Sequence, residues 1–278
     1  MRIETKFYID HYEIDTTQLT ELCDFMMRLG FTTGVAPADM TPDMRCSYFN
    51  FDGSFLECCP VGENRILDFW GRTVNVGNNG GIHVAAICVS DPDLAKTRMD
   101  EYGLNTTENA ACTRPADHGV KKGPATFRGF FSHLPDAFPK THLGPVQTQN
   151  RELIFQNGRY AHRNRVYDTV ALYYAYPTPQ ATAAAAKQMA DVNDALGDTI
   201  VKASIEKAIL LDEEAYIEEF GSPSPKNYGG DIVGIVYAGG DKEYIQEKAI
   251  AEGLDFFQKA GKLYVDARDM TGVFFIFE

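Results

Sequence analysis

Four stretches of the sequence end in the same way, and this repetition constrains the fold more than any other feature. Each reads as a helix whose periodic apolar residues stop at a glycine, with another apolar residue close behind. Glycine accepts the left-handed conformation that closes a helix, and the next apolar residue returns the chain to the core. Polar residues or proline mark each start. The sequence therefore predicts four helices, which end at Gly30, Gly103, Gly197 and Gly253.

Each predicted helix follows an apolar, β-rich stretch and precedes further short strands. The leading strands are "FYIDHYEI" (7–14), "GIHVAAICV" (81–89), "VYDTVALYYAY" (166–176) and "DIVGIVYA" (231–238). The closing strands resemble one another and each carries a glutamate. They are expected at 53–60, 150–158, 214–221 and 272–278, with Glu57, Glu152, Glu218 and Glu278. The repeated unit is a strand, a helix and about three strands.

One such unit cannot cover both faces of its own sheet, whereas paired units can curl their sheets around a shared cavity with helices outside. The sequence thus predicts an α+β fold in which four βαβββ units form two curved-sheet barrels. Residues 1–160 hold the first barrel, with units at 1–60 and 81–160, and residues 161–278 hold a degenerate second pair. Whether the first unit pairs with the second or the fourth stays open. The long insertion at 105–148 is expected to shape a pocket mouth, with His118, His133 and His142 in surface loops.

Charge and cysteine content restrict the partners and the compartment. A net charge of −13 argues against a nucleic-acid backbone or an anionic membrane surface as the main partner. Neither a membrane-spanning run nor a signal peptide is recognised. Six cysteines form no CxxC pair, which favours reduced thiols in a cytoplasm over a disulfide framework or a zinc ribbon. A small molecule is the expected partner, and a homodimer is compatible with the sequence.

Several motifs, taken in order, resemble the vicinal oxygen chelate superfamily, and more closely its glyoxalase-like branch. They are "IDHYEIDTTQLTELCDFMMRLGF", "FNFDGSFLECCPV", "GIHVAAICVSDPDLAKTRMDEYGL" and "QNRELIFQNGRYAHRN" leading into "VYDTVALYYAYPTP". The resemblance implies a divalent metal (Fe, Mn, Ni or Zn) between two paired units. Its implied ligands are a histidine on each first strand and a carboxylate on each last strand, namely His11, Glu57, His83 and Glu152.

The sequence departs from the family pattern at several places. Cys46 stands near a position where the branch usually has asparagine, and an uncertain register leaves Gln156 as the substitute for Glu152. In the third and fourth units Asp168 or Thr169 and Asp231 or Ile232 replace the histidine, so the second pair is expected to lack a metal. His11 and His83 could also serve only as local hydrogen-bonding groups at strand entrances.

The resemblance implies a metal-dependent enzyme acting on a small molecule with vicinal oxygens. A lyase or isomerase would use Glu152 or Glu57 as a mobile base. An extradiol-type dioxygenase would instead use two histidines and one glutamate around iron. Arg128 is the candidate for binding a substrate carboxylate. The alternative is a non-catalytic protein of the same fold that binds a small molecule, which the aromatic content of 12% also fits.

Overall fold

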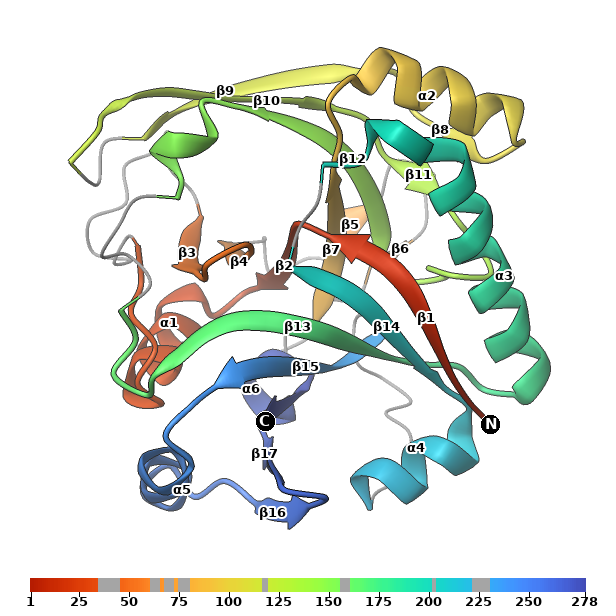
Figure 1. The fold of residues 1–278 in the computed structure, drawn as a ribbon. Coiled ribbons are helices and arrows are strands. Elements are labelled where there is room, and N and C mark those ends of the chain that lie inside the picture. The colour runs from red at the N-terminus through yellow and green to blue at the C-terminus, as the bar shows by residue number, and fades with distance from the viewer. Residues whose placement is uncertain are drawn as a thin grey trace.

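The computed structural model describes residues 1–34, 46–60, 66–67, 73–74, 81–116, 120–155, 161–201, 204–221 and 231–278 (Figure 1). The four predicted helices are α1 (Leu19–Arg28), α2 (Pro92–Glu101), α3 (Pro179–Leu196) and α5 (Lys242–Ala251). All four glycines that were predicted to end them have positive φ angles, of 90°, 73°, 51° and 68° in chain order. The side chains of Asp91, Thr178 and Asp241 accept backbone N–H groups at the starts of α2, α3 and α5. These helices are confirmed.

The first two units join through their leading strands. β2 (His11–Thr16) pairs antiparallel with β7 (Ile82–Cys88), and each leading strand pairs in parallel with the last strand of its own unit. These last strands are β4 (Phe55–Pro60) and β12 (His142–Gln149). β3 (Ser47–Asn50) flanks β4, while β10 (Gly123–Gly129) and β9 (Ala110–Ala116) extend the sheet beyond β12. The result is a curved sheet in the order β3-β4-β2-β7-β12-β10-β9. Short strands accompany it at β5 (Ile66–Leu67), β6 (Thr73–Val74), β8 (Asn105–Thr106) and β11 (Ser132–His133).

The third and fourth units repeat the arrangement, except that the strand beside β14 comes from the start of the chain. β13 (Val166–Ala175) pairs antiparallel with β15 (Ile232–Gly239) and in parallel with β14 (Ile205–Leu211). β15 pairs in parallel with β18 (Phe274–Phe277), followed by β17 (Lys262–Asp266) and β16 (Phe256–Lys259). The chain's first strand, β1 (Arg2–Ile9), pairs antiparallel with β14. The apolar run at 7–14 is therefore divided at Asp10 between the strands of the two pairs, and these strands form one continuous sheet because β15 also pairs with β7.

Two of the predicted closing strands are not strands in the described residues, which end at 155 for the one expected at 150–158. Residues 214–220 fall in helix α4 (Glu213–Phe220), which Asp212 caps, and Gly221 ends it; β14 takes the place of the last strand of the third unit. Residues 151–153 form the 3-10 helix η2 (Arg151–Leu153), and β12 is the last strand of the second unit. The short apolar segments at both places fit either type of structure locally, so long-range pairing decided between them. The remaining helical elements are η3 (Gly197–Thr199) and α6 (Arg268–Thr271).

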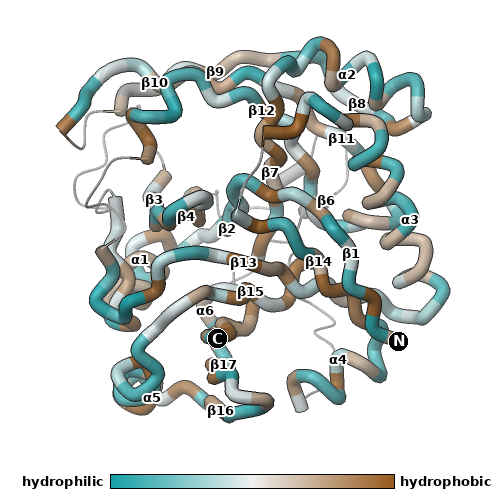
Figure 2. Tube along the Cα trace, viewed as in Figure 1, coloured by the Kyte–Doolittle hydropathy of each residue, from teal (hydrophilic) through white to brown (hydrophobic). Residues whose placement is uncertain are grey.

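The inner face of the second sheet is filled by side chains. On β14, Ala208 and Leu210 join the main core together with residues of α3. Ile209 and Leu211 point to the opposite face, because successive strand residues alternate. There they pack with Tyr216 of α4 in a separate apolar cluster. Figure 2 shows apolar residues recurring along β7, β12 and β14. Within the described residues, no helix has the length and apolar character that crossing a bilayer would need.

Candidate active site

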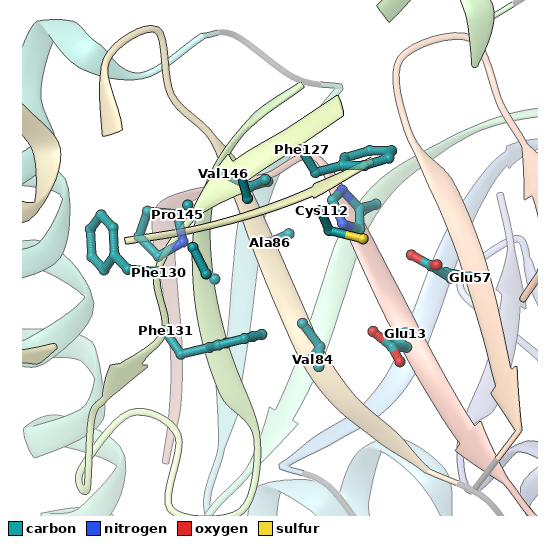
Figure 3. Close-up of a pocket in the computed structure, with 15 residues that line it drawn as sticks. Glu13, Glu57, Val84, Ala86, Cys112, Phe127, Phe130, Phe131, Pro145 and Val146 are labelled. Atoms are coloured by element: carbon teal, nitrogen blue, oxygen red, sulfur yellow. The ribbon is translucent and has the colours of Figure 1, made fainter. Parts of the chain in front are cut away.

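The inner face of the first sheet encloses a cavity of about 380 Å³ (Figure 3). Strands of both units line it, and part of the wall comes from β9 and β10, which lie within the predicted insertion. Its lining residues are His11, Glu13, Glu57, Val84, Ala86, Ala110, Ala111, Cys112, Phe127, Gly129, Phe130, Phe131, Gly144, Pro145 and Val146. The insertion thus shapes the pocket as expected.

The register of β2 and β4 builds the polar wall of this cavity. The parallel pairing sets His11 beside Phe55, Glu13 beside Glu57 and Asp15 beside Cys59. Alternate residues of a strand share one face, so these three rows all lie on the inner side of the sheet. Figure 3 shows the carboxylates of Glu13 and Glu57 directed toward the same space. A nitrogen donor and two carboxylates therefore stand together on one wall.

The opposite wall is apolar. Phe127 of β10, the following Phe130 and Phe131, and Pro145 and Val146 of β12 face the polar wall across the cavity. Small residues of β7 keep the space open, since Ala86 lies opposite His11 in the β2–β7 pairing and Val84 lies opposite Glu13. The cavity suits a ligand that is apolar at one end and carries oxygen atoms at the other.

The imidazole of His11 is held in a defined orientation. It donates its Nδ1–H to Oδ2 of the buried Asp10 (3.0 Å), and it stacks on Phe55 with ring centroids 4.2 Å apart. The other Asp10 oxygen forms an ion pair with Arg151 Nη1 at 2.6 Å. An ionised carboxylate can only accept hydrogen bonds. In the neutral ring the proton therefore resides on Nδ1, which leaves the lone pair of Nε2 for a cation or a substrate proton.

Burial dominates the electrostatics of the carboxyl groups in the site. It raises the pKa of Glu57 well above its usual value. Burial, followed by the charge of neighbouring Glu13, raises the pKa of Asp15 to about 8. A hydrogen bond with Cys46, followed by burial, raises the pKa of the Cys59 thiol. These groups hold protons at neutral pH unless a cation replaces them.

The structure brings His11 and Glu57 to the cavity but leaves His83 outside it. The β2–β7 register shifts between Glu13, which pairs with Val84, and Ile14, which pairs with Ile82. His83 is the extra residue at this bulge and is only 1% exposed. Its Nδ1 lies 3.7 Å from Asp15 Oδ2, and burial lowers its pKa.

Glu152 and Arg128 also lie away from the cavity lining. Glu152 is exposed on η2, after the end of β12. Arg128 donates from Nη2 to both carboxylate oxygens of Asp93, at 2.6 and 2.7 Å. Its strand neighbours Phe127 and Gly129 line the cavity instead, as strand alternation requires. Gln156, the substitute for Glu152, lies outside the described residues.

Several site residues were not found from the sequence. Glu13 lines the cavity and Asp15 lies further along the same strand face, because both follow His11 at intervals of two residues, a signal visible in "HYEID" once the stretch is taken as a strand. His142 is buried at the start of β12, contrary to the expected surface loop, while His118 lies outside the described residues. Nothing local in the sequence indicated that β12 would begin at His142.

Comparisons with known proteins identify similar structures but no similar sequences. Neither a family model nor a curated protein sequence matches the chain. The 2,3-dioxygenase LapB from Pseudomonas sp. KL28 superposes with a TM-score of 0.56 and 11% identity, covering 98% of this chain and 92% of that chain. A catechol 2,3-dioxygenase gives 0.54 and 8%, covering 98% and 88%. A mutant 4-hydroxymandelate synthase from Streptomyces coelicolor gives 0.52 and 10%, covering 98% and 92%. At such identities the likeness is one of fold.

Proposed function

We propose that this chain, whose fold is that of the vicinal oxygen chelate superfamily, is a metal-dependent enzyme acting on a small molecule with two adjacent oxygen atoms. The observation that carries the proposal is the two-sided cavity of the first pair of units. His11, Glu13 and Glu57 stand on one wall, and aromatic and aliphatic side chains stand on the other. Convergent polar groups in an otherwise apolar pocket are typical of a small-molecule site.

The polar wall offers donor atoms for a divalent cation, but within the described residues those of His11, Glu13 and Glu57 do not all meet within 4.8 Å, so side-chain rotation would have to bring them onto one ion. His11 offers Nε2, since its Nδ1–H is bound by Asp10, and this second contact orients the ring as in many metal sites. The carboxylates of Glu13 and Glu57 lie on adjacent strands at one level of the sheet. One nitrogen and two oxygen donors suit Fe, Mn, Ni or Zn. When bound, such a cation supplies Lewis acidity toward two adjacent substrate oxygens.

The remaining groups indicate proton transfer. Glu13 and Glu57 are neighbours, so one carboxylate can hold the cation while the other takes or returns a substrate proton. Burial favours a protonated Glu57, which makes its carboxyl a proton donor at neutral pH. The apolar wall excludes water and holds the rest of the substrate. We therefore favour a lyase or isomerase reaction.

Two other functions have specific support. The 2,3-dioxygenases among the similar structures favour dioxygenase chemistry. The cavity lining, however, offers one histidine and two carboxylates, which differs from the two histidines and one carboxylate usual for non-haem iron oxygenases. The apolar wall by itself would also serve a protein that binds a ligand without converting it.

The test begins with the full-length protein, stripped of metal by a chelator and titrated with Mn²⁺, Fe²⁺, Ni²⁺ and Zn²⁺ by calorimetry. The loaded forms are then screened for oxygen uptake with catechols and for proton exchange or isomerisation with compounds that carry adjacent oxygens. His11→Ala and Glu57→Gln are expected to weaken cation binding at least tenfold. Glu218→Gln, on the exposed face of α4, is the matched control and is expected to bind normally.

The outcomes separate the three functions. Proton exchange without oxygen uptake supports the lyase or isomerase, and oxygen uptake supports the dioxygenase. A wild-type protein that binds none of the four cations but binds small apolar ligands would overturn the enzyme proposal. It would leave the ligand-binding function in its place.

A further inference from the structure

Next to the cavity, the inner face of the first sheet carries a group of thiols and carboxylates that the proposed reaction does not need. The donor atoms of Cys46, Glu57 and Cys59 all lie within 4.8 Å of one another. Those of Glu13, Asp15 and Cys59 meet the same limit, so Cys59 belongs to both groups. Five side chains with metal-ligating atoms therefore form one continuous cluster.

Three neighbouring segments of chain bring these side chains together. Cys59 lies beside Asp15 in the parallel pairing of β4 with β2. On the other side of β4, Ser47 lies opposite Cys58, so that Cys46, the residue before β3, comes next to Cys59. Glu57 and Cys59 are only 7% and 9% exposed, while Cys46 is half-buried. The donors are thus held on paired strands and largely shielded from water.

A histidine at the edge of this cluster gives independent evidence for a ligand. His83 is 1% exposed, and its Nδ1 faces Asp15 Oδ2 at 3.7 Å, beyond hydrogen-bonding distance. Within the described parts of the chain, neither of its ring nitrogens meets the geometry of a normal hydrogen bond, and the backbone of Gly81 interacts with the ring only weakly enough that burial still lowers the pKa of His83. Leaving buried polar atoms without partners costs free energy, so such groups in native proteins commonly serve a site.

We propose that Cys46, Glu57 and Cys59 bind a thiophilic divalent cation such as Zn²⁺, with Asp15 as the fourth donor and His83 holding Asp15 in place. Two sulfur donors select zinc-like cations over magnesium, calcium or manganese. Buried carboxylates and thiolates need a compensating charge, and a divalent cation provides it as the ligands release their protons. The bulge that removes His83 from the cavity gives this residue its place beside Asp15.

The inference deepens the proposed function, because Glu57 also faces the cavity. Two thiolate ligands select Zn²⁺, which has no redox chemistry. A cation held in this way would therefore favour proton transfer over iron–oxygen chemistry. The inference rests on the proposed function only for the type of reaction that the cation would favour. Binding of the cation itself can be measured without any substrate.

Co²⁺ is the probe, because its thiolate complexes absorb in the near-ultraviolet and Zn²⁺ displaces it. We expect the reduced full-length protein to bind Co²⁺ with a thiolate-to-cobalt band that disappears when Zn²⁺ is added. Zn²⁺ is also expected to protect Cys46 and Cys59 from a thiol reagent. Cys46→Ser and Cys59→Ser should abolish the band and weaken Zn²⁺ binding at least tenfold. Cys88→Ser, on β7 and outside both the cluster and the cavity lining, should keep the band.

Each result either supports the inference or overturns it. Absence of a thiolate band in the wild-type protein overturns it, even if a serine variant fails to fold. So does cation binding that depends on His11 and is unchanged in Cys46→Ser and Cys59→Ser, although this result leaves the proposed function intact. A thiolate band together with no turnover of any screened substrate supports the cation site and overturns the enzyme proposal.

Discussion

Asp15→Asn is expected to remove a large part of the pH dependence of stability in the cation-free protein. Burial, together with the charge and hydrogen bond of Glu13, raises the pKa of Asp15 from 3.8 to about 8, and His83 opposes this shift. The folded chain therefore keeps a proton that the unfolded chain has already released. This contribution to stability is fully present below the unfolded pKa and is lost as the pH rises toward about 8.

The size of the effect follows from the number of protons bound. Between the two pKa values the folded state holds about one more proton, so the free energy of unfolding falls by about 1.4 kcal/mol per pH unit. Across two pH units within this window the loss is about 3 kcal/mol. Asparagine resembles the protonated carboxyl in shape and does not titrate. The variant should therefore lack this loss, while contributions from Glu57 and His83 remain in both proteins and cancel in the difference.

The assay is urea unfolding in the presence of a chelator, at several pH values from about 5.5 to about 7.5. The slope of unfolding free energy against pH should be less negative in Asp15→Asn than in the wild type by about 1.4 kcal/mol per unit. Asp194→Asn, an exposed position on α3, is the control and should keep the wild-type slope. Equal slopes in Asp15→Asn and the wild type would refute the reasoning.

Three further predictions test other parts of the molecule. Asp10→Asn should weaken cation binding through His11 by roughly 10–100-fold, measured by calorimetry, because the ring loses the carboxylate that orients it; unchanged affinity would argue against His11 as a ligand. Cys112, exposed on the cavity wall, should react with iodoacetamide and be protected by a cavity ligand, which mass spectrometry can follow. Glu219→Gln should lower the free energy of unfolding by about 2 kcal/mol, because this buried carboxylate accepts hydrogen bonds from Tyr173 and Tyr264; an unchanged urea midpoint would contradict this.

Local sequence signals were sufficient for the helices and for two residues that line the cavity. A helix end needs only a residue that tolerates positive φ, and Gly103 and Gly253 provide it without reference to the rest of the chain. His11 and Glu57 were found because their strands recur in similar form, and both reach the cavity. Glu13 was within reach of the same reasoning, since it follows His11 at the spacing of one strand face.

The remaining features depend on contacts between distant segments. β1 pairs with β14, more than 190 residues further along the chain, and no local pattern distinguishes that partner from the neighbouring unit. Residues 151–153 turn as a 3-10 helix after β12 has already taken the place of the closing strand, which leaves Glu152 exposed.

By itself, the sequence determined the helices, the repeated unit and the two strands that carry His11 and Glu57, because helix ends and strand alternation are set by nearby residues. Only the tertiary structure decided which side chains share a site. One extra residue in β7 reverses the direction of the side chains beyond it, and such a bulge arises from pairing with β2. The two histidines at matching sequence positions therefore have different surroundings. His11 lines the cavity, whereas His83 is buried outside the lining, next to Asp15.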